Sequence, residues 1–246
     1  MLNNIAITLD IDWAPDLIIQ QIAKILINKN VKATWFITHD SEQIQTLFKY
    51  PELFEVGIHP NFKKNSSQGE SPEKIIDFLL NIAPKAKSVR THSLYQSTPI
   101  LKLLKNKGLK NDVSIFLSHA QNITPTEYFF SQYDCISRFP FLWEDDEEIN
   151  RLNPCFNPKK FVTQKGLKIF NFHPIHIFMN SCVNSTYENI KHLLNPFNSN
   201  DLKPFINKNP GVGTFFQELV NFLEKNKDAN TISEISDQWD KLNPRA

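Results

Sequence analysis

Two aspartates, Asp10 and Asp12, end an apolar, β-prone run that begins at Ile5. A strand sends alternate side chains to opposite faces, so both carboxylates should leave the chain on the same side. Two like charges this close resist joint ionisation unless a cation or a basic group lies between them. Taken alone, the pair is more typical of an Asp-rich turn after a strand, so its meaning depends on the rest of the chain.

Basic side chains follow three later β-prone runs in the same way: His59 after 54–58, Arg90 and His92 at the end of 88–91, and His173 after 167–172. In a parallel barrel the carboxyl ends of the strands open on one rim, so these residues would converge there. A single histidine after a strand is usually a loop residue. Polar side chains at the ends of four strands, all expected on the same rim, instead favour a functional site.

This set of side chains suits metal-assisted hydrolysis. A catalytic divalent ion takes three histidine or carboxylate ligands and keeps a position for water. It lowers the pKa of that water and polarises a carbonyl group. A free carboxylate can then take the proton, and a histidine can protonate the leaving group.

The elements that must position these residues alternate between strand and helix, which predicts parallel strands with crossover helices. We expect strands at 5–10, 33–37, 54–58, 88–91, 113–116, 135–139 and 167–172, helices at 18–26, 41–49, 72–82, 98–108, 214–225 and after 233, and long loops at 141–163 and 195–212. A length of 246 residues fits one α/β domain spanning 1–246.

Composition excludes several classes of protein. The net charge is +1 and the basic residues form no block, so neither nucleic acid nor an acidic membrane is expected as a partner. The three cysteines form no CxxC pair, which argues against a disulfide framework and a structural zinc cluster. No signal peptide and no apolar run of about 20 residues is visible, so we expect a cytoplasmic protein without stable membrane insertion. The oligomeric state is left open.

Five motifs resemble those of the NodB-type polysaccharide deacetylases, carbohydrate esterase family 4. They are TLDID at 8–12, KATWFI at 32–37, EVGIHPN at 55–61, RTHS at 90–93 and FHP at 172–174. Their order matches that of the family, and they span most of the chain. The stretch FPFLWED at 139–145 is similar to the divergent WbmS-like branch, which modifies sugars for surface polysaccharides.

The resemblance implies a distorted (β/α) barrel of about seven parallel strands with a divalent metal, often zinc, at the strand ends. It assigns Asp10 as general base, Asp12 and His59 as metal ligands, Arg90 as the residue that orients Asp10, and His173 as general acid or, as imidazolium, oxyanion stabiliser.

One departure concerns the metal. The family has a second histidine ligand four residues after the first, where this chain has Lys63. We favour His92 as the third ligand. The alternatives are an ion held by two residues and waters, an amide oxygen from Asn61, or a degenerate site.

A sugar presents an apolar face and hydroxyl edges, so an aromatic side chain beside carboxylates suits it. Trp143, Glu144 and Asp145 are therefore candidate substrate contacts, although a solvated acidic loop is an equal alternative. Asn61 is a further candidate substrate contact. His176 either supports the site or lies on the surface, and Asn171 and Tyr95 are weaker candidates.

The resulting hypothesis is a metal-dependent deacetylase that acts on an N- or O-acetylated sugar, a precursor of a surface glycan. One rival is a hydrolase of another amide, such as a cyclic ureide. The other is a non-catalytic carbohydrate-binding protein with a degenerate metal site.

Overall fold

Nine strands form one sheet in the part of the chain that the computed structural model describes, residues 2–132, 134–194 and 197–244. The strands are β1 (Ile5–Asp10), β2 (Ala33–Ile37), β3 (Phe54–Ile58), β4 (Ser88–Val89), β5 (Asn111–Asp112), β6 (Thr126–Ser131), β7 (Asp134–Arg138), β8 (Trp143–Glu144) and β9 (Lys168–Phe172). Their order in the sheet is β6-β7-β5-β4-β3-β2-β1-β9-β8. All neighbours pair in parallel except β6 and β7, which form an antiparallel hairpin.

The sheet curls, and the segment 139–142 shows how. The amide of Phe139 donates to Asp112 O of β5, whereas the amide of Leu142 donates to Ile169 O of β9. A segment of four residues thus reaches strands that lie far apart in the sheet order. The carboxyl ends of β1, β3, β4 and β9 consequently face a common space.

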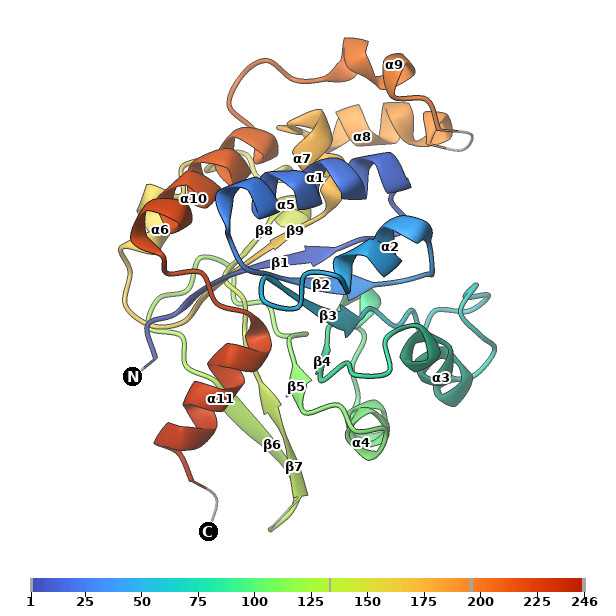
Figure 1. Cartoon of the computed structure of the whole chain (residues 1–246), viewed down its shortest axis with the longest axis vertical. Coiled ribbons are helices and arrows are strands. Elements are labelled where there is room, and N and C mark those ends of the chain that lie inside the picture. The colour runs from blue at the N-terminus through green and yellow to red at the C-terminus, as the bar shows by residue number, and fades with distance from the viewer. Residues whose placement is uncertain (1, 133, 195–196, 245–246) are drawn as a thin grey trace.

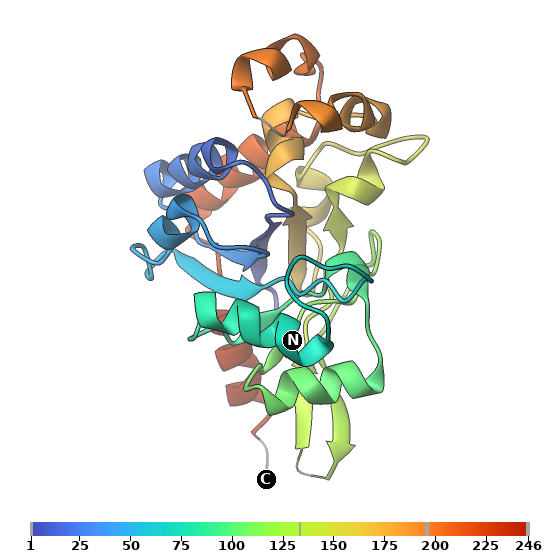
Figure 2. The ribbon, with the colours of Figure 1, turned by 90° about the vertical axis from the view of Figure 1, so that its right-hand side faces the viewer.

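Helices flank this sheet (Figure 1). They are α1 (Asp16–Lys29), α2 (Glu42–Leu47), α3 (Pro72–Ile82), α4 (Thr98–Asn106), α5 (Asp145–Glu148), α6 (Lys159–Val162), α7 (Pro174–Met179), α8 (Asn184–Ile190), α9 (Ser199–Leu202), α10 (Val212–Asn226) and α11 (Ile232–Leu242), with short 3-10 turns at His92–Leu94, Lys191–Leu193 and Lys203–Phe205. Helices α1, α7 and α10 pack together on one flank. In both ribbon views α8 and α9 lie at one end of the molecule, and the β6–β7 hairpin and α11 at the other (Figure 2). No described helix is long and apolar enough to cross a membrane.

Local sequence explains most of these elements. Strand β1 is buried along its whole length, as its continuous apolar run requires in a sheet covered on both faces. The hydroxyl groups of Ser41, Ser71 and Ser97 each accept a hydrogen bond from the backbone three residues on, which caps the N-termini of α2, α3 and α4. Thr231 and Glu234 form a capping box at the start of α11.

Three predictions about the fold need correction. The expected seven-strand barrel is a curled sheet of nine strands in the described residues. The strand expected at 113–116 lies two residues earlier, at β5, and only Phe116 forms an isolated bridge. The expected loops contain β8, α5 and α6, and α9, while residues 195–196 lie outside the described part. Elements of two to four residues are too short to show periodicity, which is why the pattern missed them.

Candidate active site

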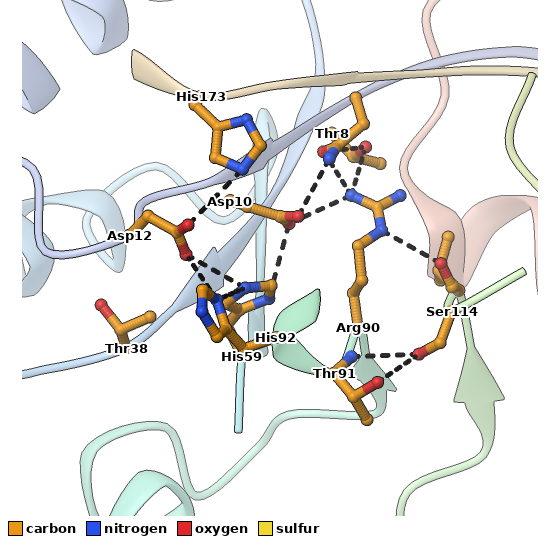
Figure 3. Close-up of polar contacts among 12 residues, drawn as sticks. Thr8, Asp10, Asp12, Thr38, His59, Arg90, Thr91, His92, Ser114 and His173 are labelled. Carbon is orange, nitrogen blue, oxygen red and sulfur yellow. Dashed lines mark hydrogen bonds and ion pairs between the residues drawn. The ribbon is translucent and has the colours of Figure 1, made fainter. Parts of the chain in front are cut away.

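Asp10 is the last residue of β1, and both of its carboxylate oxygens are held. Oδ1 accepts a hydrogen bond from Arg90 Nη1 at 3.0 Å (Figure 3). Oδ2 accepts one from Asn171 Nδ2 at 2.9 Å. The side chain is 3 % exposed. It therefore has a fixed orientation at the floor of the site, as a general base requires.

Arg90 is buried completely, and its surroundings fix the position of its charge. Its guanidinium carbon lies 4.8 Å from the ring centre of Phe36 and 4.4 Å from that of Phe141. Nε donates to Val113 O at 3.0 Å, and Nη1 donates to Thr8 Oγ1 at 2.9 Å. A buried cation is tolerated only with such compensation. This geometry fits the role predicted for Arg90, the orientation of Asp10.

Three donor atoms form a small triangle beside Asp10. Asp12 Oδ1 lies 3.1 Å from His59 Nε2 and 3.3 Å from His92 Nδ1, and the two imidazole nitrogens lie 3.3 Å apart. Figure 3 shows the three side chains turned toward one another. The structure thus brings His92, which the sequence favoured as third ligand, next to Asp12 and His59.

Asp12 reaches this triangle in a different way from the one expected. Strand β1 ends at Asp10, and Asp12 and Trp13 have φ angles of 38° and 57°. The turn is held by a hydrogen bond from Trp13 N to Thr38 Oγ1 at 3.2 Å. Strand alternation therefore does not set the position of Asp12. A left-handed turn sets it, in a backbone conformation that is uncommon for residues other than glycine.

The triangle fits a divalent ion. An ion bound tetrahedrally at about 2.0–2.1 Å separates its ligands by roughly 3.3–3.4 Å, close to the distances between these three atoms. Asp12 Oδ1 is buried and, among the described residues, has no hydrogen bond of good geometry. Burial raises the pKa of Asp12, but His59, His92 and His173 outweigh it and hold that pKa well below its usual value. The carboxylate is therefore ionised and available to a cation.

His173 follows β9 and lies on the other side of Asp12 from the two histidines (Figure 3). Asp145 holds it twice: Oδ1 lies 2.7 Å from His173 Nδ1, and Oδ2 accepts the backbone N–H at 2.6 Å. Burial lowers the pKa of His173, but Asp146, Asp145 and Asp12 outweigh it and raise that pKa well above the usual value. Nε2 therefore carries a proton and points into the site, 3.6 Å from Asp12 Oδ2.

The predicted substrate contacts divide into two groups. Trp143 is fully buried and stacks on Phe215 with ring centres 4.2 Å apart, so it is a core residue and not a sugar platform. Asp145 is equally buried and contacts His173. Asn61 Oδ1 accepts the backbone N–H of Lys63 at 3.0 Å, a bond within its own loop.

Glu144 lies at the site itself. Its Oε1 accepts a hydrogen bond from Asn171 Nδ2 at 3.2 Å. A carboxylate oxygen of Glu144 also lies within 4.8 Å of ligand atoms of Asp10 and His173. Burial raises the pKa of Glu144 to about 7, against the opposing effect of His173.

Two residues are more important than the sequence indicated. Asn171, weighed as a pocket residue, is completely buried and bridges Asp10 and Glu144. Asp146 lies beside His173 and binds His176 Nε2 at 2.9 Å. Asn171 and His173 repeat the i, i+2 spacing of Asp10 and Asp12 on the neighbouring strand, a signal that was present in the sequence.

A cavity of about 120 Å³ opens at this point. Asp12, Trp13, Asp146, His173, His176 and Tyr187 are among the residues that line it. It adjoins the triangle at Asp12 and reaches His173, so a small acyl group or part of a sugar has room next to the candidate acid.

Comparisons with known proteins identify the family of the chain. A family model described as WbmS-like polysaccharide deacetylase matches residues 7–191. The structure of WbmS from Bordetella bronchiseptica, assigned as a polysaccharide deacetylase involved in O-antigen biosynthesis, is 32 % identical and covers 89 % of this chain and 90 % of its own, with a TM-score of 0.75.

More distant structures share the fold alone. A protein assigned as a polysaccharide deacetylase from Mycobacterium smegmatis is 15 % identical, with a TM-score of 0.62 and coverage of 98 % of this chain and 92 % of its own. The 4-alpha-glucanotransferase of Thermococcus litoralis is 12 % identical, with a TM-score of 0.57 and coverage of 95 % and 38 %. No curated protein matches the chain. The match over residues 7–191 and the 32 % identity to WbmS show that the chain belongs to the WbmS-like polysaccharide deacetylases, a family of hydrolases.

Proposed function

We propose that this protein is a metal-dependent deacetylase that removes the acetyl group of an N- or O-acetylated sugar during surface polysaccharide synthesis. The observation that carries the proposal is the triangle of Asp12, His59 and His92, next to which lie a held carboxylate, Asp10, and a protonated His173. The assignment of WbmS to O-antigen biosynthesis supports the class of substrate.

The chain's own residues have distinct tasks in this proposal. A divalent ion held by Asp12, His59 and His92, zinc in our proposal because the donors are two imidazoles and a carboxylate, would polarise the acetyl carbonyl and acidify a water. Asp10 takes a proton from the attacking water, and its bonds to Arg90 and Asn171 keep its lone pairs directed into the site.

His173 acts as the acid. Its Nε2 donates a proton to the leaving nitrogen or oxygen, and Asp145 keeps the ring in the required orientation. The candidate base and the candidate acid lie close to each other, with ligand atoms within 4.8 Å, so both can reach one acetyl group.

The position of His92 also argues against the non-catalytic alternative. That alternative rested on Lys63, which occupies the place of a ligand in the family. His92 supplies a third donor atom at 3.3 Å from both Asp12 Oδ1 and His59 Nε2. A triad is thus available without a histidine at position 63.

The test combines metal analysis with acetate release. We expect the purified protein to contain a divalent metal and to release acetate from a member of a panel of acetylated sugars, and a chelator should abolish this release. Asp12→Ala and His59→Ala should lose the metal, whereas Asp10→Asn should keep the metal and lose activity. Absence of metal together with absence of acetate release would refute the proposal, and turnover of a cyclic ureide alone would favour the rival hydrolase.

A further inference from the structure

Two buried, hydrogen-bonded residues hold Asp146 beside His173, and neither has a task in the proposed deacetylation. Its Oδ1 lies 2.9 Å from His176 Nε2, and His176 Nδ1 lies 2.9 Å from Ser181 Oγ. When His176 Nε2 carries the ring proton, it donates to the Asp146 carboxylate, and Nδ1 accepts a hydrogen bond from the Ser181 hydroxyl. His176 and Ser181 are both buried, so they fix the direction in which Asp146 points.

The second carboxylate oxygen of Asp146, Oδ2, lies on the side of His173. Oδ2 lies 3.9 Å from His173 Nε2, too far for a hydrogen bond between them. Among the described residues it has no hydrogen bond, and the side chain is 54 % exposed and lines the cavity next to His173. An atom about 3 Å from Nε2 can lie about 3 Å from this oxygen as well.

The leaving atom of the substrate must occupy that position, because it receives the proton of His173. We propose, building on the proposed deacetylase function, that Asp146 Oδ2 accepts the N–H of a scissile N-acetyl group and makes the site selective for amides over esters. An amide nitrogen carries a hydrogen that needs an acceptor once the sugar leaves water. The corresponding ester oxygen carries none, and a carboxylate repels the negative charge that develops on it.

The proton balance agrees with this role. The water adds its hydroxyl to the carbonyl carbon, and its other proton goes to Asp10. His173 Nε2 gives its proton to the nitrogen as the C–N bond breaks, so the amine leaves with this hydrogen and with the one bonded to Asp146. The acetyl group, with the added hydroxyl, leaves as acetic acid. The proton on Asp10 returns to His173 through solvent.

The test uses two probes that differ at the scissile atom only: methyl 2-acetamido-2-deoxyglucoside and methyl 2-O-acetylglucoside. The variant is Asp146→Asn, in which the bond to His176 occupies the amide oxygen and turns the NH₂ group toward the substrate. The matched control is Glu147→Gln, which removes the same charge from the same helix at a residue paired with Arg151. Acetate release is measured for the wild type and both variants.

We expect Asp146→Asn to lower kcat/KM for the amide by about tenfold to a hundredfold, the range for a hydrogen bond to a charged group, and to change the ester by less than about twofold. Glu147→Gln should change neither. An equal loss on both probes would show a general structural role for Asp146, and no loss on the amide would show no role; either result overturns the proposal.

A binding experiment separates this inference from the proposed function. If the wild type turns over neither probe, the deacetylase proposal loses support, but ligand-observed NMR with methyl glucosaminide and methyl glucoside still tests Asp146. Preference of the wild type for the amine, lost in Asp146→Asn, supports the inference. Equal binding of both sugars to the wild type contradicts it.

Discussion

Replacement of Asn171 by leucine tests whether this buried amide holds the base in place. The two side chains share the same branched shape and leucine is the larger, so the substitution removes hydrogen bonds and leaves no cavity. Asp10 Oδ2 and Glu144 Oε1 each lose the bond from Asn171 Nδ2, whereas Arg90 Nη1 keeps Thr8 and Asp10 as partners. Glu144 can respond by holding a proton, since burial already raises its pKa to about 7.

The main cost is the unpaired oxygen of Asp10, a buried carboxylate. We expect a loss of about 3 kcal/mol in the free energy of unfolding, of which about 2 kcal/mol comes from Asp10. For a chain of this length the thermal midpoint should fall by about 6–12 °C. Calorimetry measures it, with Asn221→Leu on the exposed face of α10 as a matched control that should change stability by less than about 0.5 kcal/mol.

The same variant has a kinetic signature. With Oδ2 free, Asp10 is fixed through Oδ1 alone, and a displacement of about 1 Å lowers kcat by up to about a hundredfold. The metal content should not change, because no hydrogen bond in the structure joins Asn171 to Asp12, His59 or His92. A lower thermal midpoint with an unchanged kcat at temperatures below it would show that Asn171 supports the fold only. An unchanged thermal midpoint would refute the predicted loss of stability.

Three further predictions concern charge and metal. Because burial raises the pKa of Glu144 to about 7, the contribution of Glu144 to stability is complete below pH 4.5 and is lost as the pH rises through 7. Glu144→Gln should therefore stabilise the protein by about 1–3 kcal/mol at pH 8 and hardly at pH 4. Urea unfolding that shows no pH dependence of this difference would contradict the assignment. His92→Ala should weaken metal binding by at least about a hundredfold in a chelator competition, whereas Lys63→His should alter it by less than about twofold; the reverse pattern would move the third ligand to the 61–64 loop. Against the effect of burial, Asp146 and Asp145 raise the pKa of His173, so Asp145→Asn should shift the alkaline limb of the kcat profile to lower pH, and an unmoved limb would assign that limb to another group.

The sequence predicted the elements that carry a long pattern. Strands β1, β2, β3 and β9 and helices α1, α3, α4 and α10 occupy the expected ranges, because continuous apolar runs and helical spacing mark them. The β6–β7 hairpin was not foreseen in full. Its first strand, TEYFFS at 126–131, is partly exposed on both faces, so it shows no alternation that would distinguish it from a loop.

At the site, the sequence predicted which strand ends converge but not how each side chain arrives. His59, Arg90 and His173 lie where the strand ends put them. Asp12 depends on a left-handed turn, which nothing in the residue types of that turn announces. Trp143 was chosen for its chemistry, and only the packing against Phe215 shows that its ring is unavailable to a ligand.

His92, the proposed third ligand, shows how a metal site could form without a histidine at position 63. Gly57 lets β3 and β4 approach closely, since a Cβ at this residue would lie 2.6 Å from Ser88 O and 2.9 Å from the ring of Phe36. The pairing continues beyond the strands, where His92 N donates to Pro60 O at 3.0 Å and so places position 92 alongside His59. The loop that carries Lys63 instead turns on the Asn61 side chain and leaves Lys63 exposed. In the proposed metal site, a histidine next in space to His59 therefore takes the place of one that is next in sequence, because the pairing of β3 and β4 sets its position.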